Sequence, residues 1–180
     1  MCMEEIEVPT EQLQEEIHHH AHGAAESWLM QVALASALLA VLAALAALLS
    51  GHDANESMMM QIQSSDRWAE FQSKSIKQSV KGTQAEILVA LGKPVPEKMT
   101  KEIERYEEEK KELAELAKKK AEDSEHLLAR HERFSVAVTF FQVAIGVAAI
   151  SVLTRRRKFF FASLAGGLVG IIMLVSGFLI

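Results

Sequence analysis

The sequence lacks the even distribution of charge expected of a soluble domain. Asp, Glu, Lys, Arg and His are all absent from residues 29–50, 134–153 and 159–180. A helix rises about 1.5 Å per residue, so about 20 apolar residues cross a hydrocarbon core roughly 30 Å thick. The three uncharged stretches hold 22, 20 and 22 residues. They argue against a soluble globule and predict three transmembrane helices.

Cysteine is scarce, and basic residues are missing from the first part of the chain. Cys2 is the only cysteine, so an intrachain disulfide and a Cys-x-x-Cys zinc site are excluded. Residues 1–28 contain seven Glu and no Lys or Arg. They form an acidic, His-rich tail without the basic region of a secretory signal, and we expect the first span to be retained in the membrane.

One short segment, residues 154–158, contains four basic residues and no acidic one. Short loops rich in Lys and Arg stay in the cytoplasm. We therefore expect this loop and the tail in the cytoplasm, and residues 51–133 in the periplasm. No nucleic-acid partner is expected, because this basic run is a tight connector between two spans rather than a surface that can follow phosphates.

Residues 51–133 are the single segment outside the spans that is large enough to be a domain. Gly51 suits the end of the first span, and Asp53 resembles the N-cap of a new helix. A Gly and two Pro residues within 92–96 predict a turn. Because the segments on either side of that turn hold 38 and 37 residues, we predict an all-α protein in which a long antiparallel, coiled-coil-like helical hairpin joins the first and second spans.

The first arm of this hairpin has a thin apolar stripe. Its members recur every seven residues at Ile62, Ala69, Ile76, Thr83 and Ala90. Polar residues dominate between positions 64 and 79, and lone helix pairs with polar seams are weakly held. We therefore expect copies of the protein to pack through an interaction seam at Asp66, Trp68, Gln72, Lys74, Ile76 and Lys77. Catalysis by these residues is the weaker interpretation, since no His, Cys or second carboxylate stands at a suitable spacing.

Small residues at four-residue spacing mark helix packing within the spans. They are Ser36, Ala40 and Ala44 in the first span and Ala162, Gly166 and Gly170 in the third. Packing within one copy explains them as well as packing between copies does. Gln31 and Gln142 are the large polar side chains of the spans, and an interhelical hydrogen bond is the favoured role for each.

Two runs resemble a known family. They are Gly51-His52-Asp53-Ala54-Asn55-Glu56 and Ser65-Asp66-Arg67-Trp68-Ala69-Glu70-Phe71-Gln72-Ser73-Lys74-Ser75-Ile76-Lys77. Together with the acidic tail and the closing pair of spans, they resemble the bacterial domain of unknown function 4337 membrane family. Arg67 departs from the Gln expected before the Trp. The resemblance implies an inner-membrane protein and no chemistry.

The tail contains a cluster of potential metal ligands. His18 and His22 are four residues apart and would share one face of a helix, and neutral imidazoles bind Zn, Cu or Ni. The alternative is a solvated tail whose histidines hold no metal, which is the more common outcome when nothing fixes the imidazoles. No other cofactor is expected.

These patterns favour a non-enzymatic, multi-pass inner-membrane protein that lies in the lipid bilayer and assembles with itself as a scaffold or partner-docking element. One alternative is an oligomeric pore lined by Ser, Thr and Gln of the spans. A second alternative is a metal-responsive membrane regulator that uses the His tract.

Overall fold

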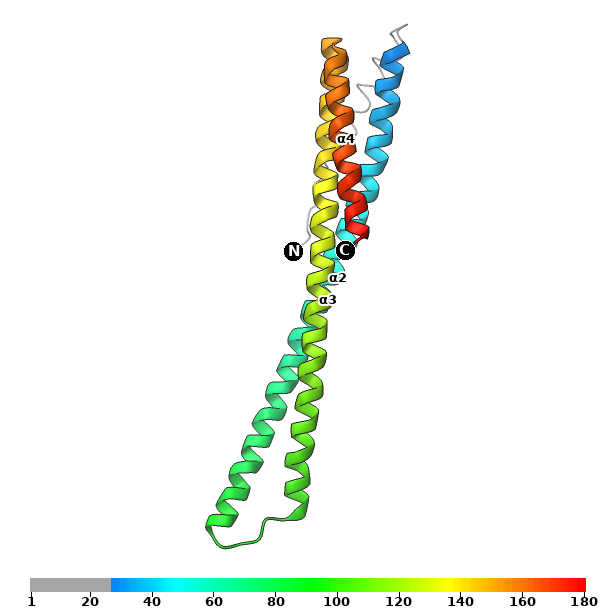
Figure 1. Ribbon diagram of the computed structural model, residues 1–180. Coiled ribbons are helices and arrows are strands. Elements are labelled where there is room, and N and C mark those ends of the chain that lie inside the picture. The colour runs from blue at the N-terminus through cyan, green and yellow to red at the C-terminus, as the bar shows by residue number, and fades with distance from the viewer. Residues whose placement is uncertain (1–26) are drawn as a thin grey trace. The chain divides into compact units, whose positions relative to one another are not determined.

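The computed structural model describes residues 27–180, and these residues are all-α. Helix α2 comprises Ser27–Ala90, α3 comprises Glu97–Thr154 and α4 comprises Arg157–Phe178. Helices α2 and α3 are long and packed antiparallel, as the sequence predicted (Figure 1). All three helices contain a stretch long and apolar enough to cross a bilayer, which indicates a multi-pass membrane protein.

The described residues fall into two units. Residues 27–54 and 128–180 make up the bundle unit, and residues 55–127 make up the hairpin unit. Helices α2 and α3 each contribute one segment to both units, whereas α4 belongs to the bundle unit alone.

Helix α2 continues without a break through Gly51 and Asp53. The expectation that Gly51 ends one helix and that Asp53 caps the next is therefore wrong. Glycine inside a helix costs only about 1 kcal/mol relative to alanine, which packing on neighbouring turns offsets. The carboxylate of Asp53 makes a contact with α3 instead of capping a helix end.

The chain reverses direction between Ala90 and Glu97. Gly92 has a φ of +68°, a left-handed conformation that glycine adopts without a steric penalty, and it follows the last turn of α2. The amide of Lys93 donates to the carbonyl of Leu88 over 2.9 Å, which closes the end of the helix. Pro96 then precedes the first turn of α3, where its carbonyl accepts from the amide of Met99.

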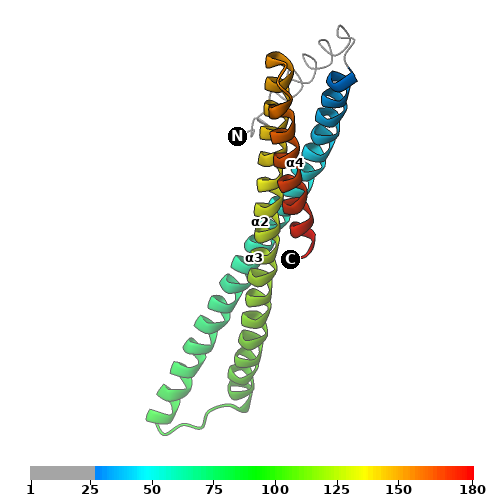
Figure 2. The ribbon, with the colours of Figure 1, turned by 45° about the horizontal axis from the view of Figure 1, so that its top comes forward.

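The core lies in the bundle unit, where all three helices contribute apolar side chains. Figure 2 shows α4 beside the last part of α3. One cluster contains Leu39, Ala43, Ala46, Ala137, Phe141, Ala144 and Ile145, and a second contains Trp28, Leu29, Val32, Ala148 and Val152. Because lipid tails are as apolar as these side chains, close packing of the helices rather than exclusion of water stabilises the unit within a membrane.

Glycines let α4 approach the other two helices closely. A Cβ on Gly170 would lie 2.6 Å from Cε1 of Phe141, and one on Gly167 would lie 2.7 Å from Cδ2 of Leu39. The hydroxyl of Ser163 donates to the carbonyl of Ala144 over 2.7 Å. The face of α4 that packs is therefore built from small residues, as is common where membrane helices meet.

A two-residue turn separates α3 from α4. Helix α3 includes Thr154 and α4 begins at Arg157, so the non-helical part of the basic segment is shorter than 154–158. Arg155 has a φ of +52°, a left-handed conformation that is uncommon for a residue with a side chain. Arg157 places its guanidinium 5.7 Å from the ring centre of Trp28, which is a cation–π contact between α4 and α2.

Candidate functional site

A polar cluster joins α2 to α3 inside the bundle unit. Its members are Ser50, Asp53, Arg130, His131 and Ser135. The Oγ of Ser50 lies 2.8 Å from the Oγ of Ser135 and 2.9 Å from Nδ1 of His131. Nδ1 of His131 is also 2.8 Å from the backbone carbonyl of Ser50, which can only accept. Nδ1 therefore carries the proton and donates to that carbonyl.

Asp53 is the one carboxylate of this cluster, and it is buried. Its side chain is 2% exposed, and Oδ2 lies 3.3 Å from Nε of Arg130. The guanidinium of Arg130 also lies 5.9 Å from the ring centre of Phe134. A buried carboxylate without its cation is costly. Burial of Asp53 is therefore favourable only when α2 and α3 pair in the arrangement that brings Arg130 to it.

The cluster contains a serine beside an imidazole, a pair that in some enzymes activates the hydroxyl as a nucleophile. Here the Nδ1 proton of His131 is committed to the Ser50 carbonyl, so this nitrogen is a donor and not a base toward Ser50. Within the described part of the chain, no three His, Cys, Asp or Glu residues gather as metal ligands. The geometry is that of a polar contact that links two helices.

Serines also hold the two arms of the hairpin unit together. Ser57 and Ser124 each donate to the other's backbone carbonyl over 2.9 Å. Ser64 donates to the carbonyl of Ala117 over 2.9 Å. Ala117 is fully buried, while larger apolar side chains of the described hairpin residues remain at least partly exposed. The arms therefore meet over small and polar side chains.

Ion pairs continue the contact between the arms toward the turn. Lys74 pairs with Glu109, and Lys81 pairs with Glu102 over 3.0 Å. The hydrogen bond from Lys74 holds the pKa of Glu109 below its ordinary value, and the bond from Lys81 does the same for the pKa of Glu102. A hydrogen bond from Gln78 likewise lowers the pKa of Glu107. The lowered pKa values mean that these carboxylates are bound in their charged form.

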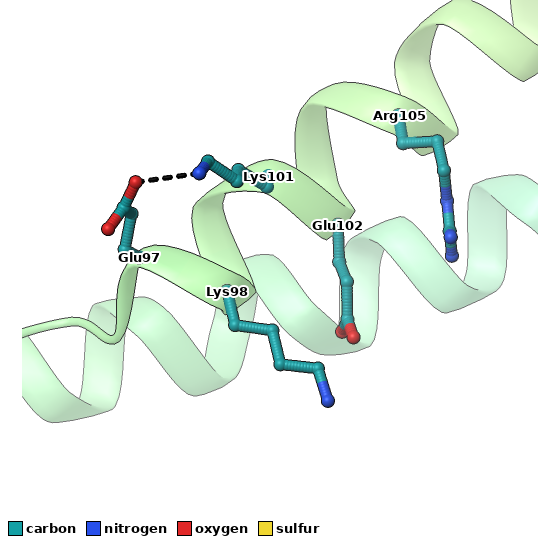
Figure 3. Close-up of a pocket in the computed structure, with 5 residues that line it drawn as sticks. All are labelled: Glu97, Lys98, Lys101, Glu102 and Arg105. Atoms are coloured by element: carbon teal, nitrogen blue, oxygen red, sulfur yellow. Dashed lines mark ion pairs between the residues drawn. The ribbon is translucent and has the colours of Figure 1, made fainter.

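A shallow recess lies beside the first turns of α3. Glu97, Lys98, Lys101, Glu102 and Arg105 line it (Figure 3). Lys101 pairs with Glu97 over 2.7 Å, but the two side chains are 71% and 82% exposed. Ion pairs of this kind contribute about 0–1 kcal/mol. The recess is a solvated charged surface, and Glu102, its member that contacts the other arm, is already paired with Lys81.

The most apolar face of the α2 arm is exposed. We call this face the outer stripe. Its ten members are exposed and alternate at spacings of three and four residues: Met59, Ile62, Asp66, Ala69, Ser73, Ile76, Val80, Thr83, Ile87 and Ala90. Ile76 is 65% exposed and Ile87 is 54% exposed. The opposite face of the arm, which includes Ser57, Ser64 and Gln78, bonds to α3.

Comparison with known families assigns the sequence of this chain to one of them. The family described as Domain of unknown function (DUF4337) matches residues 28–180. The chain belongs to the DUF4337 family. The resemblance seen in the sequence is thereby confirmed. No curated protein and no solved structure matches this DUF4337 chain.

The two runs that carried the resemblance have separate roles in this DUF4337 chain. In the first run, Asp53 reaches Arg130 of α3. In the second, Arg67 pairs with Glu70 over 2.8 Å, and the rings of Trp68 and Phe71 meet edge to face at 5.3 Å. The second run therefore orders the surface of its own helix and contributes Lys74 to the contact with α3.

The residues proposed for the interaction seam lie on different faces of α2. Asp66 and Ile76 are members of the exposed outer stripe, and Gln72 and Lys77 are exposed beside it. Trp68 is 36% exposed and packs on Phe71, while Lys74 points to Glu109. Packing of the seam against a second copy stays a prediction.

Of the small residues proposed for helix packing, some are buried between helices and others are exposed. Ser36 is buried, Ala40 packs against the core and Ala44 is exposed. In α4, Ala162 is exposed, Gly166 would bring a Cβ within 3.6 Å of the Ala144 Cβ, and Gly170 is buried against Phe141. Gln31 is exposed and Gln142 is half-buried. The residues of α4 that are buried are Ser163, Gly167, Gly170 and Gly177.

The proposed metal ligands His18 and His22 lie outside the described residues 27–180. Metal binding by the tail stays a prediction.

Sequence reasoning did not predict the polar cluster that contains Ser50, Arg130 and His131. A signal for it exists, because Ser36, Ser50, Ser57 and Ser64 are separated by multiples of seven residues and therefore share one helix face. These serines are all buried. A search for the polar members of a heptad would have identified the face of α2 that meets α3.

Proposed function

We propose that this DUF4337 protein is a non-enzymatic, integral protein of the bacterial inner membrane that assembles with copies of itself and serves as a scaffold or docking element. The observation that carries the proposal is the outer stripe. A helix in an isolated hairpin would turn its most apolar face toward the other arm. Here that face is exposed, while serines and ion pairs make the contact between the arms.

The proposed topology has three spans, with the tail and the basic turn in the cytoplasm and the hairpin unit in the periplasm. Arg155, Arg156, Arg157 and Lys158 support it through the positive-inside rule. A reporter that is active only in the periplasm, inserted at Pro94 in the turn of the hairpin, tests this arrangement. Activity at Pro94 and none at Arg156 is expected, and the reverse pattern would contradict the topology.

Self-assembly is tested by the mass of the particle extracted in a mild detergent. The protomer is 19.9 kDa. Light scattering with subtraction of the bound detergent should give the mass of two or more protomers at micromolar concentration. A particle that contains one protomer at every concentration would overturn the proposed function.

A further inference from the structure

We infer that the outer stripe of α2 is a parallel, in-register interface that binds the same stripe of a second copy of this chain. The inference rests on the proposed self-assembly and adds to it the surface, the partner segment and the orientation.

The spacing of the outer stripe identifies its partner as a helix. Exposed residues alternate at three and four positions from Met59 to Ala90, which is more than four heptads. A heptad pattern of this length keeps one seam in contact with another helix that runs nearly parallel to it. A globular partner would place no such requirement on the spacing. The α3 arm of the same chain is not that partner, because it already contacts the opposite face of α2.

A second copy of α2 fits this requirement in a single orientation. Copies inserted into one membrane share one direction, so their α2 helices are parallel and identical residues meet. Confinement to the same bilayer also raises the effective concentration of one stripe for another. A few exposed apolar side chains, with Ile76, Val80 and Ile87 in the half of the stripe nearer the turn, then suffice for association.

The residues beside the stripe are compatible with this arrangement. In a parallel coiled coil, a flanking residue faces the residue five positions further along the partner helix. The resulting pairs are Ser65 with Glu70, Gln72 with Lys77, and Ser79 with Gln84. None of these pairs brings like charges together. All six residues are exposed and can reach a partner.

Asp66 is the one charged residue of the stripe. In the in-register arrangement, it faces Asp66 of the second copy. A polar residue in a coiled-coil core lowers stability and fixes the register. Substitution by Asn removes the repulsion and keeps a polar pair, so D66N should strengthen the association without moving the register.

Disulfide trapping in the full-length chain tests the inference. The only cysteine is replaced (Cys2→Ser), and a single cysteine is then introduced as Ile76→Cys or, separately, as Val80→Cys. The matched control is Glu108→Cys, which places the thiol on the exposed surface of α3. Mild oxidation in native membranes should convert most of the I76C and V80C chains into dimers, with at least a tenfold excess over the E108C control.

The outcomes separate the two proposals. If the particle is oligomeric by mass and neither I76C nor V80C forms more dimer than E108C, the outer stripe is not the interface and self-assembly through another surface stands. A particle of one protomer overturns both proposals. Dimers of both stripe variants support the inference, because a perturbation caused by one substitution would not recur with the other.

Discussion

The carboxylate of Asp53 and the guanidinium of Arg130 meet 3.3 Å apart, and they tie α2 to α3 inside the bundle unit. Asp53 is almost fully buried, whereas Arg130 remains one-third exposed. The carboxylate therefore depends on the arginine more than the arginine depends on the carboxylate. This asymmetry makes the pair testable, because removal of either partner has a different consequence.

Arg130→Ala should destabilise the protein by about 3 kcal/mol, since it leaves a buried carboxylate without its cation. Asp53→Asn should cost less, because Arg130 can turn to solvent. Thermal unfolding of the detergent-solubilised protein measures both. In the double variant, the loss should be smaller than the sum of the single losses, and strict additivity would show that the two side chains do not interact.

Gly170→Ala should destabilise the bundle unit by about 1–3 kcal/mol, because the added methyl group would overlap the ring of Phe141. Gly51→Ala is the matched control. Gly51 is also inside a helix but has open space where a Cβ would lie, so alanine should leave stability unchanged or raise it by about 1 kcal/mol. Equal melting temperatures for the two variants would contradict the close packing of α4.

Acid should weaken the contact between the arms of the hairpin unit. The pKa values of Glu102, Glu107 and Glu109 are lowered in the folded protein from an ordinary value of 4.5. Their contribution is therefore fully present above pH 4.5 and is lost as the pH falls through the lowered pKa values. The protection of the amides of residues 70–85 against hydrogen exchange, measured relative to the intrinsic exchange rate at each pH, should fall below pH 4.5. In the Glu102→Gln, Glu109→Gln variant, that fall should be smaller.

Substitution within the outer stripe should act on association and not on folding. Ile76→Lys puts a charge on an exposed apolar position, so we expect little change in helix content and a loss of oligomer of at least tenfold. Lys111→Ile is a control on the exposed surface of α3. Loss of helix content in I76K to the same extent as loss of oligomer would indicate a folding defect instead.

The architecture was predictable because its signals are local. Uncharged stretches of about 20 residues indicate spans, and the glycine and two prolines within 92–96 indicate a turn whatever surrounds them. The helix through Gly51 was not predictable from the same rules. A glycine and a following Asp favour a break, but here Asp53 is buried against Arg130, and that contact lies 77 residues away in the sequence.

The faces of the helices were predicted less well than the helices themselves. The heptad at Ile62, Ile76 and Ala90 was recognised as the apolar stripe, yet the contact with α3 uses Ser57 and Ser64 instead. Serine contacts carry a weak sequence signal, because a buried hydroxyl that donates to a backbone carbonyl and an exposed one look the same in sequence. The division between an inner polar face and an outer apolar face appears once the partner helix is placed.

The most direct test of the central claim is the mass of the full-length protein extracted from the membrane in lipid-containing polymer discs, measured for the native sequence and for Ile76→Lys with Val80→Lys. The account predicts more than one 19.9 kDa protomer in each native disc and a shift toward one protomer in the double variant. A native disc that holds a single protomer would contradict it.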